Sequence, residues 1–469
     1  KIKNSQWELK NYFNQLYTKE KYTWGIRLYI RYTHCPASLT VAHRNLPILF
    51  ADNMLIANCI YHRNELSSPD NISENTYRTV IGQTHESILA EYEEMNTGNA
   101  YTDNVLYGMR KINGVNYQLT GGFCGELSSV KQENAYSAHS YSFYTVPRIE
   151  WERNDFLFTA ATTVRWSHLP KQSYSRFCVS PFFCFRYKFT PRWKMSLLGS
   201  LDESEGGLKD IYPFRYREDY RTVVKHTGKV PVTVRQLYTC YLEYKNTIKE
   251  FFWTLSASYS HNRYNLITER NYKDGNFYLS SVERNHSSHS YTLNTIGSKG
   301  IYDWNLKTSL ELTLARNEGK QLNEGIVQDY RYDYLCIEPK IVWAPSVFFE
   351  AEYKATVSCV GGGIGEDTSL DPLWEVAQRL TLSLEFHDTE FRLSGEHFYN
   401  DLSKNQHLNI WLADVSLIHK VGKWRFAASA INLFNKEQYR YTLYSAVQSY
   451  TSWIKLRPRE FMVSVQYQW

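Results

Sequence analysis

The sequence contains no run of about 18 apolar residues, and this absence excludes membrane-spanning helices. Proline is scarce, with 13 residues among 469, and no proline- or serine-rich linker, charge block or low-complexity tract divides the chain. The mean hydropathy of −0.50 is typical of a water-soluble protein. A membrane β-barrel has a similar value, because only alternate residues of each strand meet lipid. A single large architecture is therefore the simplest organisation.

The charged residues give no sign of a nucleic-acid partner. The chain has 53 Lys and Arg against 48 Asp and Glu, for a net charge of +5, and the two signs are interspersed. No serine–histidine–aspartate grouping or carboxylate pair has a spacing that suggests catalysis, so we expect neither an enzyme nor a cofactor site. None of the eight cysteines forms a CxxC pair, which argues against zinc and thioredoxin-like sites.

Aromatic residues, in contrast, make up 16% of the chain, and this enrichment favours β-strands. The last nine residues alternate with a strict period of two between an apolar face and a mostly polar face, and the mostly polar face carries Met462, Ser464, Gln466 and Gln468. The apolar face carries Phe461, Val463, Val465, Tyr467 and Trp469. This is the pattern of a strand with lipid on one side.

The same alternation recurs at 253–260, 304–314, 347–358 and 380–387. A soluble β-sandwich also alternates, but three features favour a membrane barrel. The alternating segments are long, roughly 10 to 14 residues, where soluble strands average about 5 or 6. Aromatic residues gather at strand ends, and tight connections alternate with long ones, as in outer-membrane barrels.

The connections predict which end of each strand faces the periplasm. Tight connections are expected at Asn154-Asp155, Thr190-Pro191-Arg192, Ser298-Lys299-Gly300, Pro345-Ser346, Asp388-Thr389 and Val421-Gly422-Lys423. Long connections are expected at 167–176, 202–233, 272–286, 316–326, 361–374, 401–408 and 436–457. Short turns lie on the periplasmic side of outer-membrane barrels and long loops lie outside.

Counting back from the C-terminus gives about 16 strands down to residue 116, and about six more fit at 24–34, 43–51, 54–64, 75–83, 86–93 and 105–111. We therefore predict an all-β fold, a transmembrane antiparallel outer-membrane β-barrel of about 22 strands. The barrel would occupy residues 24–469, preceded by a lead-in segment at 1–23.

The last 40 residues resemble the end of TonB-dependent outer-membrane receptors. The matching residues close the penultimate strand and open the terminal one, and they are Asn432, Leu433, Phe434, Asn435, Arg457, Pro458 and Arg459. The Arg-Pro-Arg opening and the Tyr-rich loop resemble the Bacteroidota branch of that family. The resemblance implies that the outer-membrane insertion machinery recognises the terminal strand from Phe461 to Trp469. Ordinary barrel closure would require the same strand.

In that family the barrel encloses an N-terminal plug that carries the TonB box, and energy from the inner membrane drives uptake of iron chelates, vitamins, glycans or peptides. Here the strand alternation starts almost at once, so we expect the plug either to lie upstream of Lys1 or to be absent. The chain also shows no signal peptide, which implies that one has been cleaved or that Lys1 is not the encoded start. Because the lumen of such a barrel is too wide for its own side chains to fill, we expect a plug, inward-folded loops or a partner chain inside it.

Charged residues on the predicted inner face are candidates for lining a substrate path, contacting a plug or meeting lumen water. They are Arg165, Lys188, Lys194, Lys307, Glu311, Glu350, Glu352, Lys354, Glu385, Arg392 and Glu396. Three other patterns have simpler explanations. The glycines at 361–365 lack the Lys-Ser/Thr of a phosphate loop and predict a flexible outer loop. His286 and His289 fall on opposite faces of a strand, which disfavours a metal site. The acidic residues between 202 and 210 predict a solvated loop, with calcium binding as the alternative.

The leading functional hypothesis is a TonB-dependent receptor or transporter of the bacterial outer membrane. A second hypothesis is a structural or assembly subunit of an outer-membrane complex that has lost transport. A passive porin is the third, and the absence of an obvious inward-folded constriction loop counts against it. The implied partners are outer-membrane lipids, a plug or partner protein in the lumen, and a surface lipoprotein or other complex subunits.

Overall fold

The computed structural model describes residues 2–4, 7–19, 22–44, 77–81, 88–131, 135–217, 222–273, 276–365, 368–403, 406–444 and 449–467. Most of these residues lie in β-strands. No helix in the described ranges is long and apolar enough to cross a membrane.

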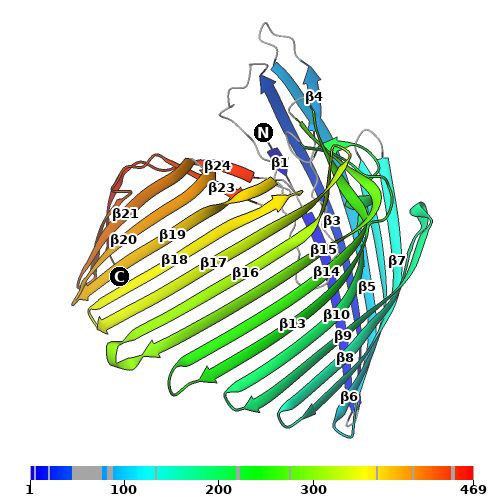
Figure 1. Ribbon diagram of the computed structural model, residues 1–469, viewed down its shortest axis with the longest axis horizontal. Helices are drawn as coiled ribbons and strands as arrows, with labels where there is room; N and C mark the ends of the chain where they lie inside the picture. The colour runs from blue at the N-terminus through cyan, green and yellow to red at the C-terminus, as the bar shows by residue number, and fades with distance from the viewer. Residues whose placement is uncertain are drawn as a thin grey trace.

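The strands form one 23-stranded sheet that curls around an interior, so that strands far apart in the sequence form opposite walls (Figure 1). Four short members lie at its margins: β1 (Ile2–Asn4), β4 (Tyr77–Ile81), β11 (Tyr216–Arg217) and β12 (Thr222–Lys225). The other nineteen pair in chain order, each antiparallel to the next. They are β2 (Trp7–Lys19), β3 (Tyr22–Arg44), β5 (Ile88–Ile112), β6 (Val115–Lys131), β7 (Ala135–Arg153), β8 (Phe156–Leu169), β9 (Tyr174–Thr190), β10 (Trp193–Glu205), β13 (Val232–Asn246), β14 (Phe251–Lys273), β15 (Asn276–Ile301), β16 (Leu306–Asn323), β17 (Ile326–Ser346), β18 (Phe349–Ile364), β19 (Thr368–Phe386), β20 (Thr389–Ser403), β21 (Gln406–Val421), β22 (Trp424–Ile431) and β25 (Glu460–Tyr467). This is the antiparallel β-barrel architecture of outer-membrane proteins.

The N-terminal part of the sheet differs from the sequence prediction in its boundaries. Strand β2 pairs with β3 along its whole length, so the segment predicted as a lead-in at 1–23 contributes a full strand. The two strands predicted at 86–93 and 105–111 are one continuous strand, β5. Most of the predicted strands 43–51 and 54–64 lies outside the described residues.

The two faces of the sheet follow the predicted alternation. On β16, Leu310 is 51% exposed and Leu314 is 39% exposed on one face. Between them, Glu311 points to the other face, where it accepts a hydrogen bond from Asn294 of β15. We call the apolar side the outer face and the polar side the inner face. Extensive exposure of large apolar side chains is unfavourable in water, whereas lipid covers the outer face of a membrane barrel.

Two aromatic rows bound the outer apolar band. At one end, Tyr238, Tyr259 and Tyr291 lie side by side on β13, β14 and β15, with ring centroids 6.4 and 5.1 Å apart. At the other end, Trp193 lies near Trp253, with centroids 6.0 Å apart. On β15 the segment from Tyr291 to Ile301 matches the roughly 9 to 11 residues that cross a bilayer. The rest of β15 therefore extends beyond the apolar band.

One end of the sheet consists of tight turns, which we call the tight-turn end. Asn113 and Gly114 have φ values of 49° and 81°, and Asn154 has a φ of 50°. Asparagine and glycine adopt this left-handed conformation more easily than other residues, which suits two-residue hairpins. Two predicted turns are displaced. Strand β15 continues through Ser298-Lys299-Gly300, and its turn contains the 3-10 helix η2 (Tyr302–Trp304). Strand β17 continues through Pro345-Ser346, so its turn lies at Val347-Phe348.

The opposite end, which we call the loop end, contains fewer loops than predicted. The long connections at 202–233 and 436–457 are confirmed; the second contains the hairpin of β23 (Gln438–Tyr444) and β24 (Ser449–Lys455). The connections predicted at 272–286, 316–326, 361–374 and 401–408 are mostly paired extensions of the strands. Above the apolar band both faces meet water, so the apolar alternation is lost while backbone pairing continues. The connection predicted at 167–176 is reduced to residues 170–173, which contain the 3-10 helix η1 (Pro170–Gln172).

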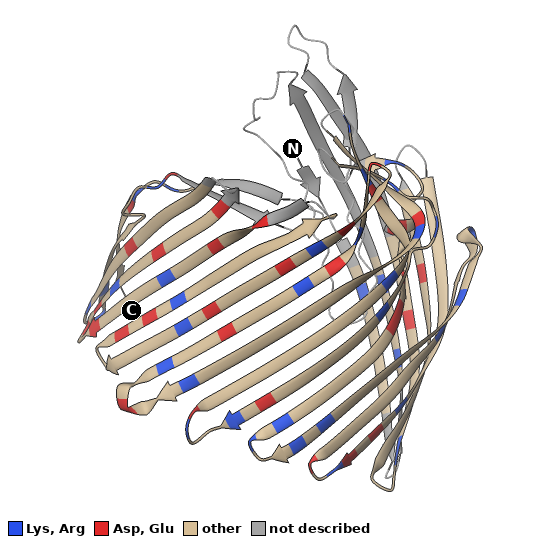
Figure 2. Cartoon of the chain, in the orientation of Figure 1, with Lys and Arg blue, Asp and Glu red and all other residues tan. Residues whose placement is uncertain are grey.

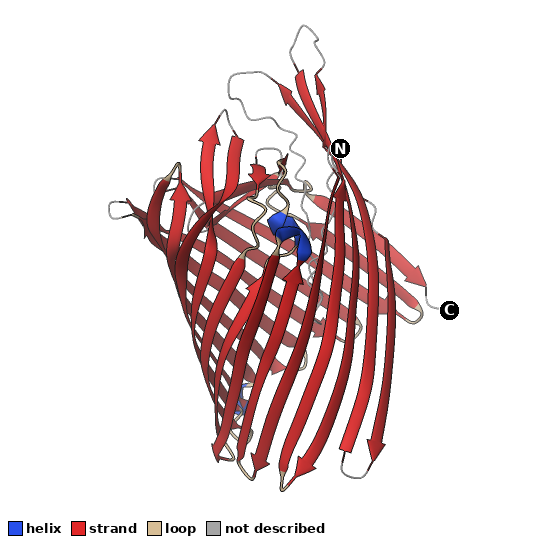
Figure 3. Ribbon diagram, turned by 90° about the vertical axis from the view of Figure 1, so that its right-hand side faces the viewer, coloured by secondary structure: helices blue, strands red, loops and turns tan. Residues whose placement is uncertain are grey.

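The connection between β10 and β13 folds against the inner face of the sheet. Residues 206–231, here called the in-folded loop, contain α1 (Leu208–Ile211), β11 and β12. Figure 3 shows α1 at the loop end, away from the tight turns. Strand β12 pairs in parallel with the extension of β15 at Phe277–Ser280. This loop contributes to the main buried apolar cluster of the described chain.

Candidate functional site

The inner face carries cross-strand pairs of opposite charge. Lys340 Nζ lies 3.2 Å from Glu352 Oε1, and Arg379 Nε lies 3.3 Å from Glu396 Oε1. These side chains are between 28% and 59% exposed, so each pair contributes at most about 1 kcal/mol to stability. Lys and Arg alternate with Asp and Glu across these strands (Figure 2). The pairs therefore leave this wall polar but locally balanced in charge.

The strand register places all the predicted lumen-lining residues on the inner face. Their positions are Arg165 on β8, Lys188 on β9, Lys194 on β10, Lys307 and Glu311 on β16, Glu350, Glu352 and Lys354 on β18, Glu385 on β19, and Arg392 and Glu396 on β20. Several are engaged with neighbours: Lys194 Nζ donates to Glu243 over 3.0 Å, and Arg392 lies 3.2 Å from Glu390. Contact with a substrate stays a prediction for each of them.

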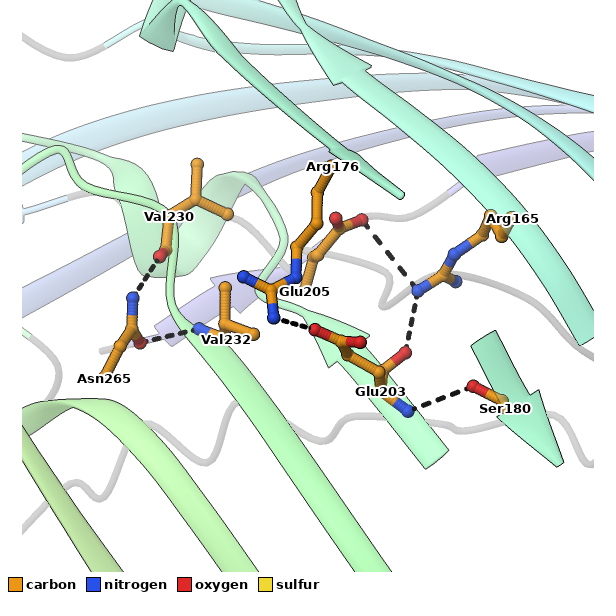
Figure 4. A network of polar contacts seen from close by, with 8 residues as sticks. All are labelled: Arg165, Arg176, Ser180, Glu203, Glu205, Val230, Val232 and Asn265. Carbon is orange, nitrogen blue, oxygen red and sulfur yellow. Dashed lines mark hydrogen bonds and ion pairs between the residues drawn. The ribbon is translucent and has the colours of Figure 1, made fainter. Parts of the chain in front are cut away.

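A network of two arginines and two glutamates holds the start of the in-folded loop (Figure 4). Arg165 donates a 2.8 Å hydrogen bond to the Glu203 carbonyl and lies 3.9 Å from the Glu205 carboxylate. Arg176 forms an ion pair with the Glu203 carboxylate. The glutamate side chains are only 10% and 11% exposed. Removing a positive partner would leave a carboxylate with little water to solvate it, so the network fixes the end of β10.

The other end of the in-folded loop is held by one amide side chain. Asn265 of β14 accepts a 2.7 Å hydrogen bond from the Val232 backbone N–H and donates a 2.9 Å bond to the Val230 carbonyl. The Gly206 N–H also donates to the Pro231 carbonyl over 2.8 Å, which closes the base of the loop. Both ends of the loop are therefore tied to the sheet and to each other.

The middle of the in-folded loop is held by apolar packing. Ile211 and Tyr212 are 1% and 2% exposed. They belong to a cluster with Tyr136 of β7 and Leu169 of β8, and the Tyr136 and Tyr212 rings meet edge to face at 5.7 Å. Tyr136 and Leu169 lie near the loop-end tips of their strands. The in-folded loop thus covers the inner rim at the loop end and does not reach the middle of the strands through this cluster.

The same cluster alters one nearby phenol. Tyr174 is the first residue of β9, a 17-residue strand that begins at the loop end. Since about 9 to 11 residues cross a bilayer, this tyrosine lies beyond the apolar band. Burial of the hydroxyl, reinforced by the nearby Glu205 carboxylate, raises the pKa of Tyr174. The phenol therefore stays neutral at physiological pH, which suits its place beside the apolar cluster.

A recess of about 590 Å³ lies in the wall where β13 to β17 approach the loop end. Its inward-facing lining includes Thr233, Ser260, Asn262, Ser288 and Ser290. The volume falls within the range of small-molecule sites, roughly 300 to 1,000 Å³. Asn265, which ties down the in-folded loop, follows these residues on β14. The recess therefore adjoins the loop's attachment to the wall.

The C-terminal motif residues form a joint between β22 and β25. Asn432 is 6% exposed, and its Nδ2 donates to the Lys436 and Arg457 carbonyls over 2.7 and 2.8 Å. Its Oδ1 accepts the Lys436 N–H over 2.9 Å. Asn435 accepts the Arg459 N–H over 2.9 Å. The two asparagines thus connect the start of the 432–459 connection to its end, across Leu433, Phe434 and Pro458.

The terminal strand has the predicted faces. Phe461, Val463, Val465 and Tyr467 lie on the outer face of β25, with exposures of 73%, 81%, 55% and 38%. Tyr467 packs on Trp424 of β22, with ring centroids 4.8 Å apart. Trp469 lies outside the described residues. Recognition of this strand during membrane insertion stays a prediction.

The acidic residues near 202–210 are not solvated as predicted. Glu203 and Glu205 are largely buried against arginines, and the Asp210 carboxylate accepts the Gly207 N–H over 3.0 Å. Within the described residues no group of three or more His, Cys, Asp or Glu side chains could hold a metal ion. The acidic residues could be recognised from the sequence. Their contacts with Arg165 of β8 and Arg176 of β9 could not, because these arginines are distant in the sequence.

The histidine and glycine patterns have structural roles. His286 pairs with Tyr264 on the inner face, and His289 stacks on His261 on the outer face, so their predicted separation is confirmed. The glycines at 361–365 were predicted as a flexible loop, but most of them lie in β18. A Cβ on Gly362 would come within 2.0 Å of the Arg331 carbonyl oxygen. Glycine is required there because β17 approaches so closely.

Comparisons with known proteins give little further information. No family model and no curated protein matches the sequence. Among solved structures, the ferric yersiniabactin uptake receptor FyuA from Yersinia pestis aligns with 99% of this chain and 78% of its own, at 10% identity and a TM-score of 0.38. At this low TM-score the match adds nothing to the fold assignment, which rests on the strand pairing and the two faces described above.

Sequence reasoning missed the in-folded loop. One signal was present: Ile211, Tyr212, Val224 and Val230 are apolar residues within a connection that was predicted to be solvated. Their partners on β6, β7 and β8 are distant in the sequence, so alternation along single strands could not identify them. Inward-folded loops were one of the three expected fillings of the lumen. This loop is one of them, but its apolar anchors lie at the rim and not at the middle of the strands, where a constriction loop would lie.

Proposed function

We propose that this chain is a receptor or transporter-like barrel of the bacterial outer membrane that imports a polar nutrient in a TonB-dependent manner. In this proposal the tight turns face the periplasm and the loop end faces the outside. The single observation that carries it is a polar inner wall whose outer rim is covered by a docked loop. Such a loop restricts access from outside. It also adjoins the recess in the wall, where a solute can be retained.

The position of the in-folded loop favours a receptor over a passive porin. Its apolar anchors, Tyr136 and Leu169, lie near the outer strand tips, so the loop covers the mouth at that side. A passive pore requires a permanently open path, whereas a docked cover must move or leave a side passage before a solute enters. The lumen beneath remains wide for a barrel of this size, which is consistent with a plug or a partner chain inside.

The C-terminal joint gives the residues of the family resemblance a structural role. Asn432 and Asn435 adopt left-handed conformations, with φ values of 55° and 52°, and their amides bridge to Arg457 and Arg459. The motif residues therefore join the two ends of the 432–459 connection in this chain, a structural role that does not depend on transport. We infer TonB dependence from the resemblance. That the transported compound is a polar nutrient is part of the proposal above.

The proposal is tested by energy-dependent uptake in the native bacterium. A strain with this gene deleted is grown on single nutrients to find the compound whose uptake it loses, and uptake of that compound is then measured with and without a protonophore. Loss of uptake on deletion, together with its collapse under the protonophore and in a TonB-deficient strain, is the expected result. Uptake that is unchanged by deletion, or unaffected by the protonophore and by loss of TonB, would contradict it.

A further inference from the structure

The inner face of β14 and β15 carries an unusual run of uncharged polar side chains. On β14 these are Thr254, Ser256, Ser258, Ser260 and Asn262, which alternate with outer-face residues. Their direct partners on β15 include Ser288, Ser290, Thr292 and Asn294. We call these nine residues the neutral track. At about 3.3 Å per residue, the β14 part extends roughly 26 Å along its strand.

The neutral track differs from the neighbouring wall. On β17 to β20 the inner face carries pairs such as Lys340–Glu352 and Arg379–Glu396. The track has no ionisable side chain in its own two rows between residues 254 and 262 or between 288 and 294. Its nearest charged neighbour on β16 is Glu311, whose carboxylate already accepts a hydrogen bond from Asn294. On β13, Arg235 lies opposite Asn262, and Glu243, which pairs with Lys194, lies opposite Thr254. A solute on the track therefore meets hydroxyl and amide groups between these flanking charges.

Hydrogen bonds connect the track to its neighbours. Thr239 Oγ1 lies 3.1 Å from Ser258 Oγ, and Asn262 Nδ2 donates to Ser288 Oγ over 3.3 Å. Asn294 Nδ2 also donates to Thr313 Oγ1 over 2.9 Å. A hydroxyl group both donates and accepts, so each of these groups retains capacity for a further partner. The surface can exchange hydrogen bonds with a passing solute at little net cost.

The track ends in the recess near the in-folded loop. Ser260, Asn262, Ser288 and Ser290 belong to both. Two charged residues at the recess margin, Asp202 and Arg235, have opposite signs and stand directly opposite each other on β10 and β13. Glu318 also borders the recess but belongs by register to the outer face, opposite Arg331. The charged residues at the recess are therefore of both signs, and among its described lining residues no cluster of positive charge is present to attract an anionic ligand.

We propose that the recess and the neutral track bind an uncharged, polyhydroxylated solute, namely a neutral oligosaccharide. This inference rests on the proposed function and specifies its substrate class. Sugar hydroxyls can replace water at the Ser, Thr and Asn side chains one for one. An anionic chelate or an acidic peptide would lose hydration there without gaining a net opposite charge, because Arg235 lies opposite Asp202, and this is unfavourable.

Binding to the purified chain in detergent tests the inference without requiring transport. The probes are the neutral hexasaccharides of maltose, cellulose, xylan, mannan and β-1,3-glucan type, together with a hexagalacturonate and a glucosamine hexamer as charged counterparts. Each is titrated by calorimetry. The expected result is that at least one neutral hexasaccharide binds at least about tenfold more tightly than either charged probe.

Variants locate the binding. The double substitution Ser260→Leu with Asn262→Leu should weaken the tightest neutral probe by at least about tenfold, whereas Ser260→Thr with Asn262→Gln should retain most of the affinity. Thr381→Leu is the control, because Thr381 lies on the inner face of β19 outside the track. Heat-modifiable electrophoretic migration confirms that each variant is folded.

The inference is overturned if no neutral probe binds, if a charged probe binds as tightly, or if the folded double-leucine variant binds like the unsubstituted chain. These outcomes leave the proposed function standing, because uptake of a charged or otherwise different nutrient could still depend on TonB. Conversely, sugar binding combined with uptake that ignores the protonophore would contradict the proposed function and leave the binding inference intact.

Discussion

Tyr212→Ala should release the in-folded loop from the inner rim. The Tyr212 ring is 2% exposed and packs against Tyr136 at 5.7 Å, Phe214 at 5.5 Å and Tyr216 at 6.0 Å. Truncating a buried aromatic side chain to alanine costs about 3 to 5 kcal/mol. The ends of the loop are still held by Arg165 and Asn265. We therefore use the lower value, about 3 kcal/mol, for the decrease in the free energy needed to open the middle of the loop.

Limited proteolysis measures that opening. Arg215, Lys225 and Lys229 provide trypsin sites within the in-folded loop. When opening is fast relative to cleavage, the cleavage rate follows the open population, and about 3 kcal/mol corresponds to an increase of roughly 100-fold. The rate of appearance of fragments cut at these sites is measured on the folded protein by mass spectrometry.

Tyr302→Ala is the matched control, because Tyr302 is 63% exposed in the turn at the opposite end of the sheet. It should leave cleavage of the in-folded loop unchanged. If Tyr212→Ala also leaves the rate within about threefold of the unsubstituted protein, less than 1 kcal/mol, packing of Tyr212 does not hold the loop. The account of the covered rim would then be refuted.

Three further substitutions test other parts of the structure. Asn432→Ala removes three side-chain hydrogen bonds worth about 1 kcal/mol each, so it should lower the temperature at which the folded band is lost on electrophoresis; an unchanged midpoint would contradict the role of the joint. Leu310→Arg places a charge on the outer face and should cost about 2 to 4 kcal/mol near the bilayer midplane, measured as a lower yield of folding into lipid vesicles. The control Ser309→Arg, on the inner face, should fold with the normal yield. Equal yields for the two variants would argue against the assigned faces. Gly362→Ala should loosen the β17–β18 pairing, because the added Cβ would meet the Arg331 carbonyl. The effect is measured as faster amide exchange around Arg331. The control is Gly361→Ala, whose Cβ has no contact closer than 3.9 Å; similar exchange in both variants would show that the close approach is unimportant.

The sequence predicted the faces of the strands well, because one physical constraint acts on every residue there. Lipid on one side and a polar interior on the other require Leu310 and Glu311 to point in opposite directions, and their alternation reveals it. The terminal strand follows the same rule. The constraint ends above the Tyr259–Tyr291 row, where both faces meet water. Strand extensions such as Tyr272 opposite Phe277 were therefore predicted as loops.

The candidate site was predictable only in part. Placement of Lys307 or Glu352 on the inner face follows from alternation alone, but the ion pair of Glu352 with Lys340 depends on the register between strands. The in-folded loop depends on contacts between Tyr212 and Tyr136, which are far apart in the sequence. The Asn432 joint was recognised through a family resemblance, and its hydrogen bonds provide the physical reason for the motif.

The most direct test of the central claim is a cysteine scan along β16 in a variant with the eight native cysteines replaced by serine. Single cysteines at Leu310, Glu311, Leu312, Thr313 and Leu314 are reacted in intact outer membranes with a lipid-soluble and a membrane-impermeant thiol reagent. The account predicts strict alternation, with 310, 312 and 314 labelled only from lipid and 311 and 313 labelled only from water. Uniform labelling of all five positions by the water-soluble reagent would contradict a membrane barrel with a polar interior.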